Sequence, residues 1–175
     1  MMPDLHMALD RGIEDLARSA NAWFFTAGSD AGVMKLFGST FHRRDIRRPL
    51  IGVFPLGVTQ GHDILMKNRG GVAPYLPKTH GPDANGAPLN PYHTHFLLVD
   101  NGTVGKAAWG SEIAFRTRLE IAAASTKGTP IVQLVVQGGA GTLTTVEQAA
   151  MVRCRRPHIS GHATHTAPLV GCGSS

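Results

Sequence analysis

The fold is constrained most by four continuous apolar runs, each followed at once by glycines. The runs lie at residues 22–26, 50–56, 95–99 and 131–136, and none alternates between apolar and polar residues. In a sheet with one solvent-exposed face, apolar and polar residues alternate along each strand. In a parallel sheet that is covered on both faces, each strand is a continuous apolar run. The four runs therefore predict buried, parallel strands.

Helical patterns separate these runs. Apolar residues recur at steps of three and four from Leu5 to Ala20, and further helices are predicted from Val33, over residues 112–125 and over residues 144–151. Strands that alternate with helices imply right-handed crossovers. We therefore expect the α/β class, with a doubly wound, mostly parallel sheet and helices on both faces.

One long stretch breaks the alternation. Residues 57–92 are rich in Gly, Pro, Asn, Asp and His and show no period. A segment of this length without regular structure in a compact domain is usually a functional loop or an insertion. We expect no helix or strand in it.

The positions of the glycines indicate a ligand site. Nine of the 21 glycines come just past the carboxyl end of a predicted strand: Gly28, Gly32, Gly57, Gly61, Gly102, Gly105, Gly138, Gly139 and Gly141. In an open parallel sheet these ends form one edge, where ligands bind. Turns from strand to helix also favour glycine for conformational reasons, but four glycine loops on one edge favour a binding site. Loops 27–32 and 138–142 run straight into helices, whose free N–H groups would hold a phosphate or carboxylate.

Two common nucleotide motifs do not fit. The dinucleotide fingerprint needs G-x-G-x-x-G and an acidic residue ending the second strand, but the first loop reads G-x-x-x-G and the second strand ends at Leu56-Gly57. A P-loop needs a hydroxyl residue after Gly-Lys, and Ala107 follows Gly105-Lys106. Neither an ordinary NAD site nor a Walker ATPase is predicted.

Composition indicates the cellular compartment of the chain and the charge of its binding partners. The net charge of +5 favours acidic partners, and the only cysteines, Cys154 and Cys172, cannot build a disulfide framework or a cysteine-rich zinc site. The longest apolar stretch, residues 49–58, is far shorter than the roughly 20 residues of a membrane span. We expect a cytosolic chain with free thiols, no secretory signal and no membrane span.

Several polar residues are weaker candidates. Asp30 and Asp100, at loop ends, are expected to contact ligand hydroxyls or cap backbone N–H groups, while Glu112 and Glu147 are expected to be solvated on helices. His93 and His95 form an H-x-H pair that is more typical of structural histidines than of metal ligands, so no metal site is predicted. The basic runs at residues 42–48 and 153–156 could meet phosphate or lipid, although such runs usually form a solvated face.

The chain also resembles a known family. The blocks at residues 22–28, 32–35, 90–103, 112–120 and 138–142 resemble the N-terminal homology region of melastatin-type transient receptor potential (TRPM) cation channels. That region belongs to the SLOG (LSDAT-type) superfamily of Rossmann-like domains. The resemblance implies a cytosolic, nucleotide-sensing regulatory domain of a TRPM-like calcium-permeable channel, with ADP-ribose or a related nucleotide as its ligand and no cofactor. It places the domain on the cytoplasmic side of a membrane.

By position, the resemblance implies a set of ligand-binding residues. They are Gly28, Ser29, Asp30, Gly32, Val33, Met34, Tyr75, Asp100, Asn101, Gly102, Gly138, Gly139, Ala140, Gly141 and Thr142. The other implied partner is the remainder of a channel polypeptide, as a homo-tetramer, and no nucleic acid is expected. The domain is predicted to span residues 1–150, possibly without its last strands, and residues 151–175 to form an atypical basic, His-rich tail.

The same superfamily contains nucleoside-monophosphate phosphoribohydrolases with the signature P-G-G-x-G-T-x-x-E. Gln137 replaces the proline of that signature, and Thr145 stands where the catalytic Glu belongs. Without that carboxylate the hydrolysis lacks its general acid–base group. Ligand binding is therefore favoured over catalysis, with a stand-alone enzyme as the alternative. A nucleic-acid or protein-interaction module is a third hypothesis, and strongly salt-dependent oligonucleotide binding would identify it.

Overall fold

The computed structural model describes residues 3–77, 86–136 and 140–154 of the chain. These residues fall into two compact units, with the boundary between Val132 and Gln133. The first unit holds the sheet and most of the helices, and the second holds one helix. The units are described separately below.

The first unit is built on a three-stranded parallel sheet. The strands are β1 (Phe24–Thr26), β2 (Leu50–Pro55) and β3 (His95–Val99), in the order β1-β2-β3. Residue Ile51 pairs with Phe25 on one side and with His95 on the other, which sets the register. All six residues of β2 are buried, as its unbroken apolar run predicts. Three of the four predicted strands are thus confirmed as parallel strands. The predicted burial is wrong for β3, which lies at the edge of the described sheet and whose residues are all exposed or half-buried.

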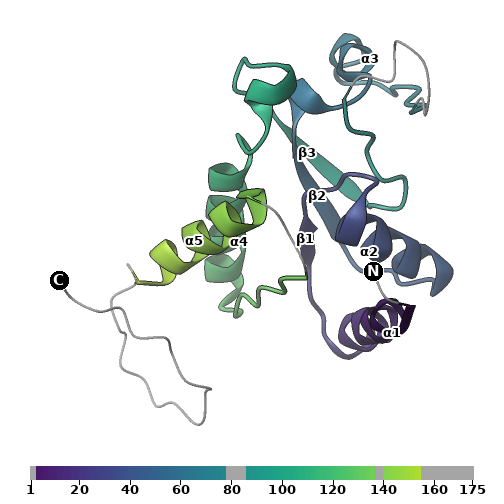
Figure 1. The fold of residues 1–175 in the computed structure, drawn as a ribbon, viewed down its shortest axis with the longest axis vertical. Coiled ribbons are helices and arrows are strands. Elements are labelled where there is room, and N and C mark those ends of the chain that lie inside the picture. The colour runs from purple at the N-terminus through teal and green to yellow at the C-terminus, as the bar shows by residue number, and fades with distance from the viewer. Residues whose placement is uncertain (1–2, 78–85, 137–139, 155–175) are drawn as a thin grey trace. The chain divides into compact units, whose positions relative to one another are not determined.

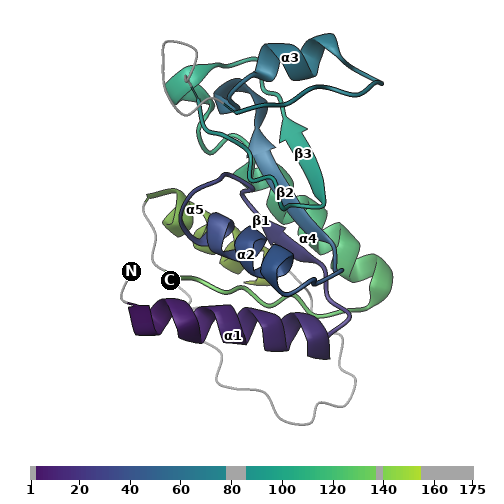
Figure 2. The same ribbon diagram turned by 90° about the vertical axis from the view of Figure 1, so that its right-hand side faces the viewer.

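Helices lie on both sides of this sheet. Figure 1 shows α1 (Pro3–Ser19) and α2 (Gly32–Arg43) on one side and α4 (Ile113–Lys127) on the other, and Figure 2 shows α2 crossing in front of β1. The larger apolar core joins α1, α2, β1 and β2 through Ile13, Ala17, Phe24, Leu36, Phe41, Ile46 and Leu50. The α/β, Rossmann-like class is therefore confirmed. The three described strands follow chain order, so the reversal of order in a doubly wound sheet is not among them.

The basic run at residues 42–48 fastens α1 to α2. Asp10 of α1 accepts hydrogen bonds from the Thr40 hydroxyl and the Arg43 guanidinium, and Arg44 pairs with Glu14 at 3.2 Å. Burial alone would raise the pKa of Asp10, but the Thr40 hydroxyl and the two guanidinium groups outweigh it and lower that pKa. These arginines therefore have a structural use within the domain.

The expectation of an unstructured stretch at residues 57–92 is wrong in part. The stretch holds most of the short helix η1 (Leu56–Val58) and all of α3 (His62–Lys67). Isolated bridges also pair Thr59 with Ala87 and Ser29 with Leu89. Local composition could not reveal the bridges, because their partners lie 28 and 60 residues apart in the sequence. Residues 78–85 lie outside the described part.

The predicted fourth strand is also wrong. Residues 131–136 carry no strand assignment, and the side chains of Val132 and Leu134 are 85% and 58% exposed. An apolar run becomes a strand only when a neighbouring strand accepts its hydrogen bonds, and the run itself does not encode that neighbour. This run also crosses the boundary between the two units.

The second unit contains α5 (Ala140–Cys154). The helix predicted at residues 144–151 is confirmed and extends further at both ends. Residues 155–175 lie outside the described part of the chain, so the division at residue 150 stays a prediction. None of the helices in the described ranges is both long and apolar enough to cross a bilayer.

Candidate functional site

The first glycine loop follows β1 and is tightly packed. Gly28 has a φ of +81°, and a Cβ there would lie 2.8 Å from the Cα of Gly52 and 2.9 Å from Cε1 of Phe96. Its own N–H donates to Oγ1 of Thr26 at 2.9 Å. Glycine is therefore required here both for the backbone angle and for the close approach of β1 to β2.

The loop leads into α2 without a side-chain cap. Ala31 occupies the N-cap position in an extended conformation and provides no side-chain hydrogen bond. The first amides of a helix have no acceptor within it, which applies here to Gly32, Val33 and Met34. They also carry the positive end of the helix dipole. This is the arrangement that an anionic ligand group needs, and its occupation by a ligand stays a prediction.

The loop after β3 is shaped by its own side chains. Asp100 accepts the N–H of Gly102 at 2.9 Å, and Asn101 accepts the N–H of Thr103 at 3.1 Å. The capping alternative for Asp100 is therefore the one observed. The carbonyl oxygen of Thr103 would lie 1.9 Å from a Cβ on Gly57, so the loops after β2 and β3 meet closely.

Tyr75 lies beside the loop after β2. Its hydroxyl accepts the N–H of Leu89 at 3.0 Å. Its ring lies next to Gly61, where a Cβ would be 3.6 Å from Cε2 of Tyr75. Burial raises the pKa of Tyr75, against the lowering effect of the Leu89 N–H. The side chain packs against a second apolar cluster, formed by Phe54, Val58, Leu89 and Ala108. Its hydroxyl therefore orients the segment that carries Leu89. Stacking of this ring on a ligand stays a prediction.

Sequence patterns did not reveal that residues 86–90 lie across the carboxyl ends of β1 and β2. Asn90 donates its N–H to the Gly28 carbonyl at 2.9 Å, and Asp30 donates its N–H to the Pro88 carbonyl at 2.8 Å. On the other side, Ala87 exchanges backbone hydrogen bonds with Val58 and Gln60. The segment therefore joins the loops that follow β1 and β2.

A polar network built on the buried Asn90 and His93 side chains holds the glycine loop. The Asn90 side chain is 0% exposed and donates Nδ2–H to Oδ1 of Asp30 at 2.8 Å. His93 contacts Oδ1 of Asn90 at 3.1 Å and Oγ1 of Thr26 at 2.7 Å. Burial lowers the pKa of His93 to about 4, so the ring is neutral at neutral pH. These contacts fit the structural role expected for His93 from the sequence.

Glu112 differs from the expectation of a solvated helix residue. It is 6% exposed, and burial raises its pKa although its own N–H, Arg116 and the Gly110 N–H all act to lower it. Its Oε2 atom and Oγ of Ser111 are buried without a hydrogen-bond partner among the described residues. The expectation that Glu112 is solvated was wrong because a charged residue at the start of a helix is ordinarily exposed to solvent. Trp109, just before it, is half exposed and packs edge-on against Phe54.

The structure brings part of the predicted site together. The residues after β1, Tyr75 and residues 100–102 all belong to the first unit and follow the carboxyl ends of its strands. Gly138 and Gly139 lie outside the described residues, and Ala140, Gly141 and Thr142 open α5 in the second unit. The carboxyl edge is therefore described for three of the four predicted loops.

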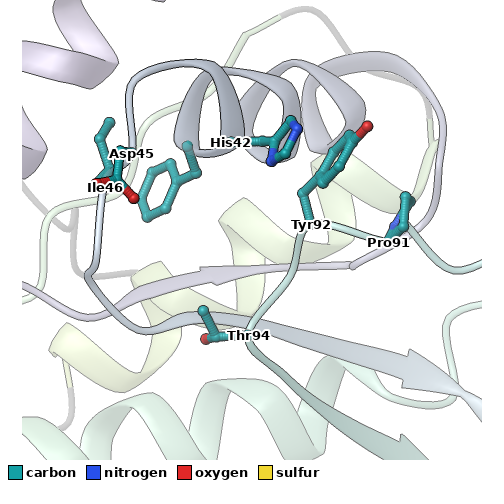
Figure 3. Close-up of a pocket in the computed structure, with 7 residues that line it drawn as sticks. His42, Asp45, Ile46, Pro91, Tyr92 and Thr94 are labelled. Carbon is teal, nitrogen blue, oxygen red and sulfur yellow. The ribbon is translucent and has the colours of Figure 1, made fainter.

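A separate hollow lies at the opposite end of the sheet. It has a volume of about 300 Å³ and is lined by Phe41, His42, Asp45, Ile46, Pro91, Tyr92 and Thr94. Figure 3 shows the His42 and Tyr92 rings side by side at its rim, stacked with centroids 4.2 Å apart. None of the predicted ligand residues lines it, and it contains no glycine loop that runs into a helix.

No metal centre is evident in the described ranges. They contain no group of three or more His, Cys, Asp or Glu side chains that could hold an ion. Both ring nitrogens of His93 are engaged in the buried network, and Nδ1 of His95 contacts the Thr94 hydroxyl at 2.8 Å.

Comparisons with known proteins identify the family. The family model described as "SLOG in TRPM" matches residues 1–167. The chain is 33% identical over 163 residues to the transient receptor potential cation channel subfamily M member-like 2 of Nematostella vectensis, which covers 83% of the chain and 10% of that protein. It is 34% identical over 155 residues to subfamily M member 7 of Rattus norvegicus, covering 82% and 8%. Subfamily M member 2 of the same species is 34% identical over 155 residues, covering 79% and 10%.

The chain thus spans about a tenth of the length of these relatives. The matched region includes the glycine loop, the Asn90 network and the loop after β3. The chain belongs to the SLOG domain family of TRPM channels.

Proposed function

We propose that this domain is a nucleotide-sensing regulatory module of a TRPM-like, calcium-permeable cation channel. The observation that carries the proposal is the glycine loop at residues 28–32, which delivers the uncapped start of α2 to the carboxyl edge of a parallel sheet. The ligand would be a nucleotide of the ADP-ribose class.

The chemistry of this edge fits such a ligand. The amides of Gly32, Val33 and Met34, at the uncapped start of α2, would donate hydrogen bonds to a phosphate oxygen. The carboxylate of Asp100, at the end of β3, would accept a ribose hydroxyl in addition to the Gly102 N–H. The net charge of +5 favours the anionic ligand at a distance.

Binding would act on the channel through a shift in equilibrium. A ligand moves a conformational equilibrium only by its difference in affinity between the two states. The domain would therefore sense nucleotide from the cytoplasmic side of the membrane, as one part of a tetrameric channel. The relatives' much greater length leaves room for the channel polypeptide that such a module would regulate.

The alternative is a phosphoribohydrolase-like enzyme of the same superfamily. Binding is favoured because Thr145 occupies the position of the catalytic glutamate, and its hydroxyl donates to the Gly141 carbonyl at 2.9 Å within α5. A hydroxyl in that position cannot act as the carboxylate acid–base group of those enzymes.

Calorimetric titration with ADP-ribose, AMP and cyclic ADP-ribose, with a product assay on the same samples, tests the proposal. Saturable binding without turnover supports a sensor. Release of free base from AMP would put the enzyme first. Binding of single-stranded oligonucleotides that is stronger than nucleotide binding and falls steeply with salt would favour the interaction module.

A further inference from the structure

The orientation of the Asn90 side-chain amide is fixed by its neighbours. Its Oδ1 atom accepts the N–H of Tyr92 at 3.1 Å and contacts Nδ1 of His93 at 3.1 Å. Its Nδ2 atom therefore faces Oδ1 of Asp30, at 2.8 Å. A carboxylate accepts hydrogen bonds only, so the opposite amide orientation would leave two oxygens facing each other.

The His93 ring extends this network to the glycine loop. Since Asn90 Oδ1 is an acceptor, Nδ1 of His93 carries the proton and Nε2 accepts the Thr26 hydroxyl. The oxygen of that hydroxyl in turn accepts the N–H of Gly28. Gly28 and Asp30 of the loop that leads into α2 are thus held by one partly buried chain of hydrogen bonds.

Asp30 behaves differently from the other aspartate with the same local sequence. Asp100 and Gly102 form an Asp-x-Gly turn in which the carboxylate accepts the glycine N–H at 2.9 Å. Asp30 and Gly32 also form an Asp-x-Gly sequence. In the part of the chain that the structure describes, however, the Asp30 carboxylate bonds to Asn90 and Lys35 and not to the Gly32 amide, and the N-cap residue Ala31 provides no side-chain hydrogen bond.

The reason lies in the partners that hold Asp30. One carboxylate oxygen is bound by the buried Asn90 amide, and the other contacts Lys35 at 3.4 Å. The Lys35 contact is long and exposed, so it contributes little. The charge-assisted bond from Asn90 is shorter, at 2.8 Å, and its donor is fully buried, so it is the stronger restraint. Released from Asn90, an aspartate two residues before a glycine amide would cap that amide, as Asp100 does.

We propose that Asn90 is a positioning residue that keeps the Gly32 amide open for an anionic ligand. It does so by holding Asp30 away from the start of α2. This inference rests on the proposed nucleotide function, because it explains how the anion-binding amides of that site stay free of an internal carboxylate. It also assigns a role to the first residue of the N-P-Y-H sequence at residues 90–93, none of which is among the predicted ligand-binding residues.

A double-mutant cycle with ADP-ribose as the probe tests this role. Asn90→Ala is expected to weaken binding roughly five- to tenfold, the cost of competing with an aspartate cap. In an Asp30→Ala background, where no carboxylate can compete, Asn90→Ala should change the affinity less than twofold. An equal loss in both backgrounds would overturn the inference, because a general structural defect does not depend on Asp30.

A second readout needs no ligand. Hydrogen exchange at the Gly32 amide should be fast in the wild type. It should be slower in Asn90→Ala, because the Asp30 carboxylate then accepts the Gly32 N–H. Exchange in Asn90→Ala that is as fast as in the wild type contradicts the inference.

If Asn90→Ala does not fold, Asn90→Asp replaces it. The new carboxylate repels Asp30 at neutral pH and regains a hydrogen-bond donor when it is protonated in acid. If the wild type binds no nucleotide but the exchange pattern is as expected, the proposed function is contradicted. The positioning of Asp30 by Asn90 is then still supported.

Discussion

The side-chain oxygen of Asn90 occupies the space that a Cβ of Gly38 would need. A methyl group at Gly38 would lie 2.0 Å from Oδ1 of Asn90, in the middle of α2. The helix that begins at the glycine loop is therefore packed, six residues after its start, against the residue that orients that loop. This contact links two segments that are 52 residues apart in the sequence.

We predict that Gly38→Ala lowers the free energy of unfolding by about 1–3 kcal/mol, the usual cost of overpacking. Alanine otherwise favours a helix, so the sign of the change reports the contact with Asn90. Urea denaturation measures it. Gly12→Ala in α1 is the matched control, because nothing lies within 4 Å of a Cβ there, and it should stabilise by about 0.5–1 kcal/mol. A neutral or stabilising Gly38→Ala would refute the contact.

A second pair of glycines separates backbone strain from packing. Gly28 and Gly70 both have positive φ, +81° and +78°, but only Gly28 is crowded. Gly70→Ala should cost about 1 kcal/mol from strain alone. Gly28→Ala should cost about 2 kcal/mol more, since its methyl group meets Gly52 and Phe96. Equal losses, measured by thermal unfolding, would show that β1 and β2 are not in close contact there.

The neutral His93 predicts a loss of stability in mild acid. Its pKa is lowered from 6.5 to about 4 in the folded state, so the unfolded state takes up a proton first as the pH falls. The contribution is fully present above pH 6.5 and is lost between there and pH 4, amounting to about 3 kcal/mol. His93→Gln should remove this part of the pH dependence, while His42→Gln, at an exposed position, should not. Identical pH profiles for all three proteins would contradict a neutral, buried ring.

Glu112 predicts the opposite behaviour. Burial raises its pKa, so at neutral pH the folded domain carries a poorly solvated carboxylate. Glu112→Gln should therefore stabilise the domain by about 1 kcal/mol at pH 7, and the gain should shrink as acid protonates the wild-type group. The exposed Glu147 provides the control, since Glu147→Gln should change little. A loss of stability in Glu112→Gln would mean that the charge is compensated in the fold.

Local patterns predicted the parts of the fold that depend on local sequence. The apolar runs of β2 and β3 and the helical pattern at residues 112–125 were sufficient to place β2, β3 and α4. Residues 131–136 failed because strand formation depends on a neighbouring strand, which a run of apolar residues does not specify.

The predicted site shows the same division. The loop after β1 could be predicted because a glycine loop between a strand and a helix is a local pattern. The roles of Asn90 and His93 could not, because they arise from contacts with Thr26, Asp30 and Gly38, more than 50 residues earlier in the chain. Glu112 was misplaced because burial is a property of the folded domain, not of a charged residue type.

The central claim, that an anionic nucleotide binds at the start of α2, is tested most directly by ADP-ribose titration of a matched pair of variants. Nothing lies within 4 Å of a Cβ on Gly32, and its φ of +51° is one that Asp and Asn tolerate. Gly32→Asp and Gly32→Asn thus differ essentially in one negative charge. We predict saturable binding by the wild type, at least tenfold weaker binding by Gly32→Asp than by Gly32→Asn, and no turnover. Equal affinities in the two variants, or no binding to the wild type at millimolar ADP-ribose, would contradict the claim.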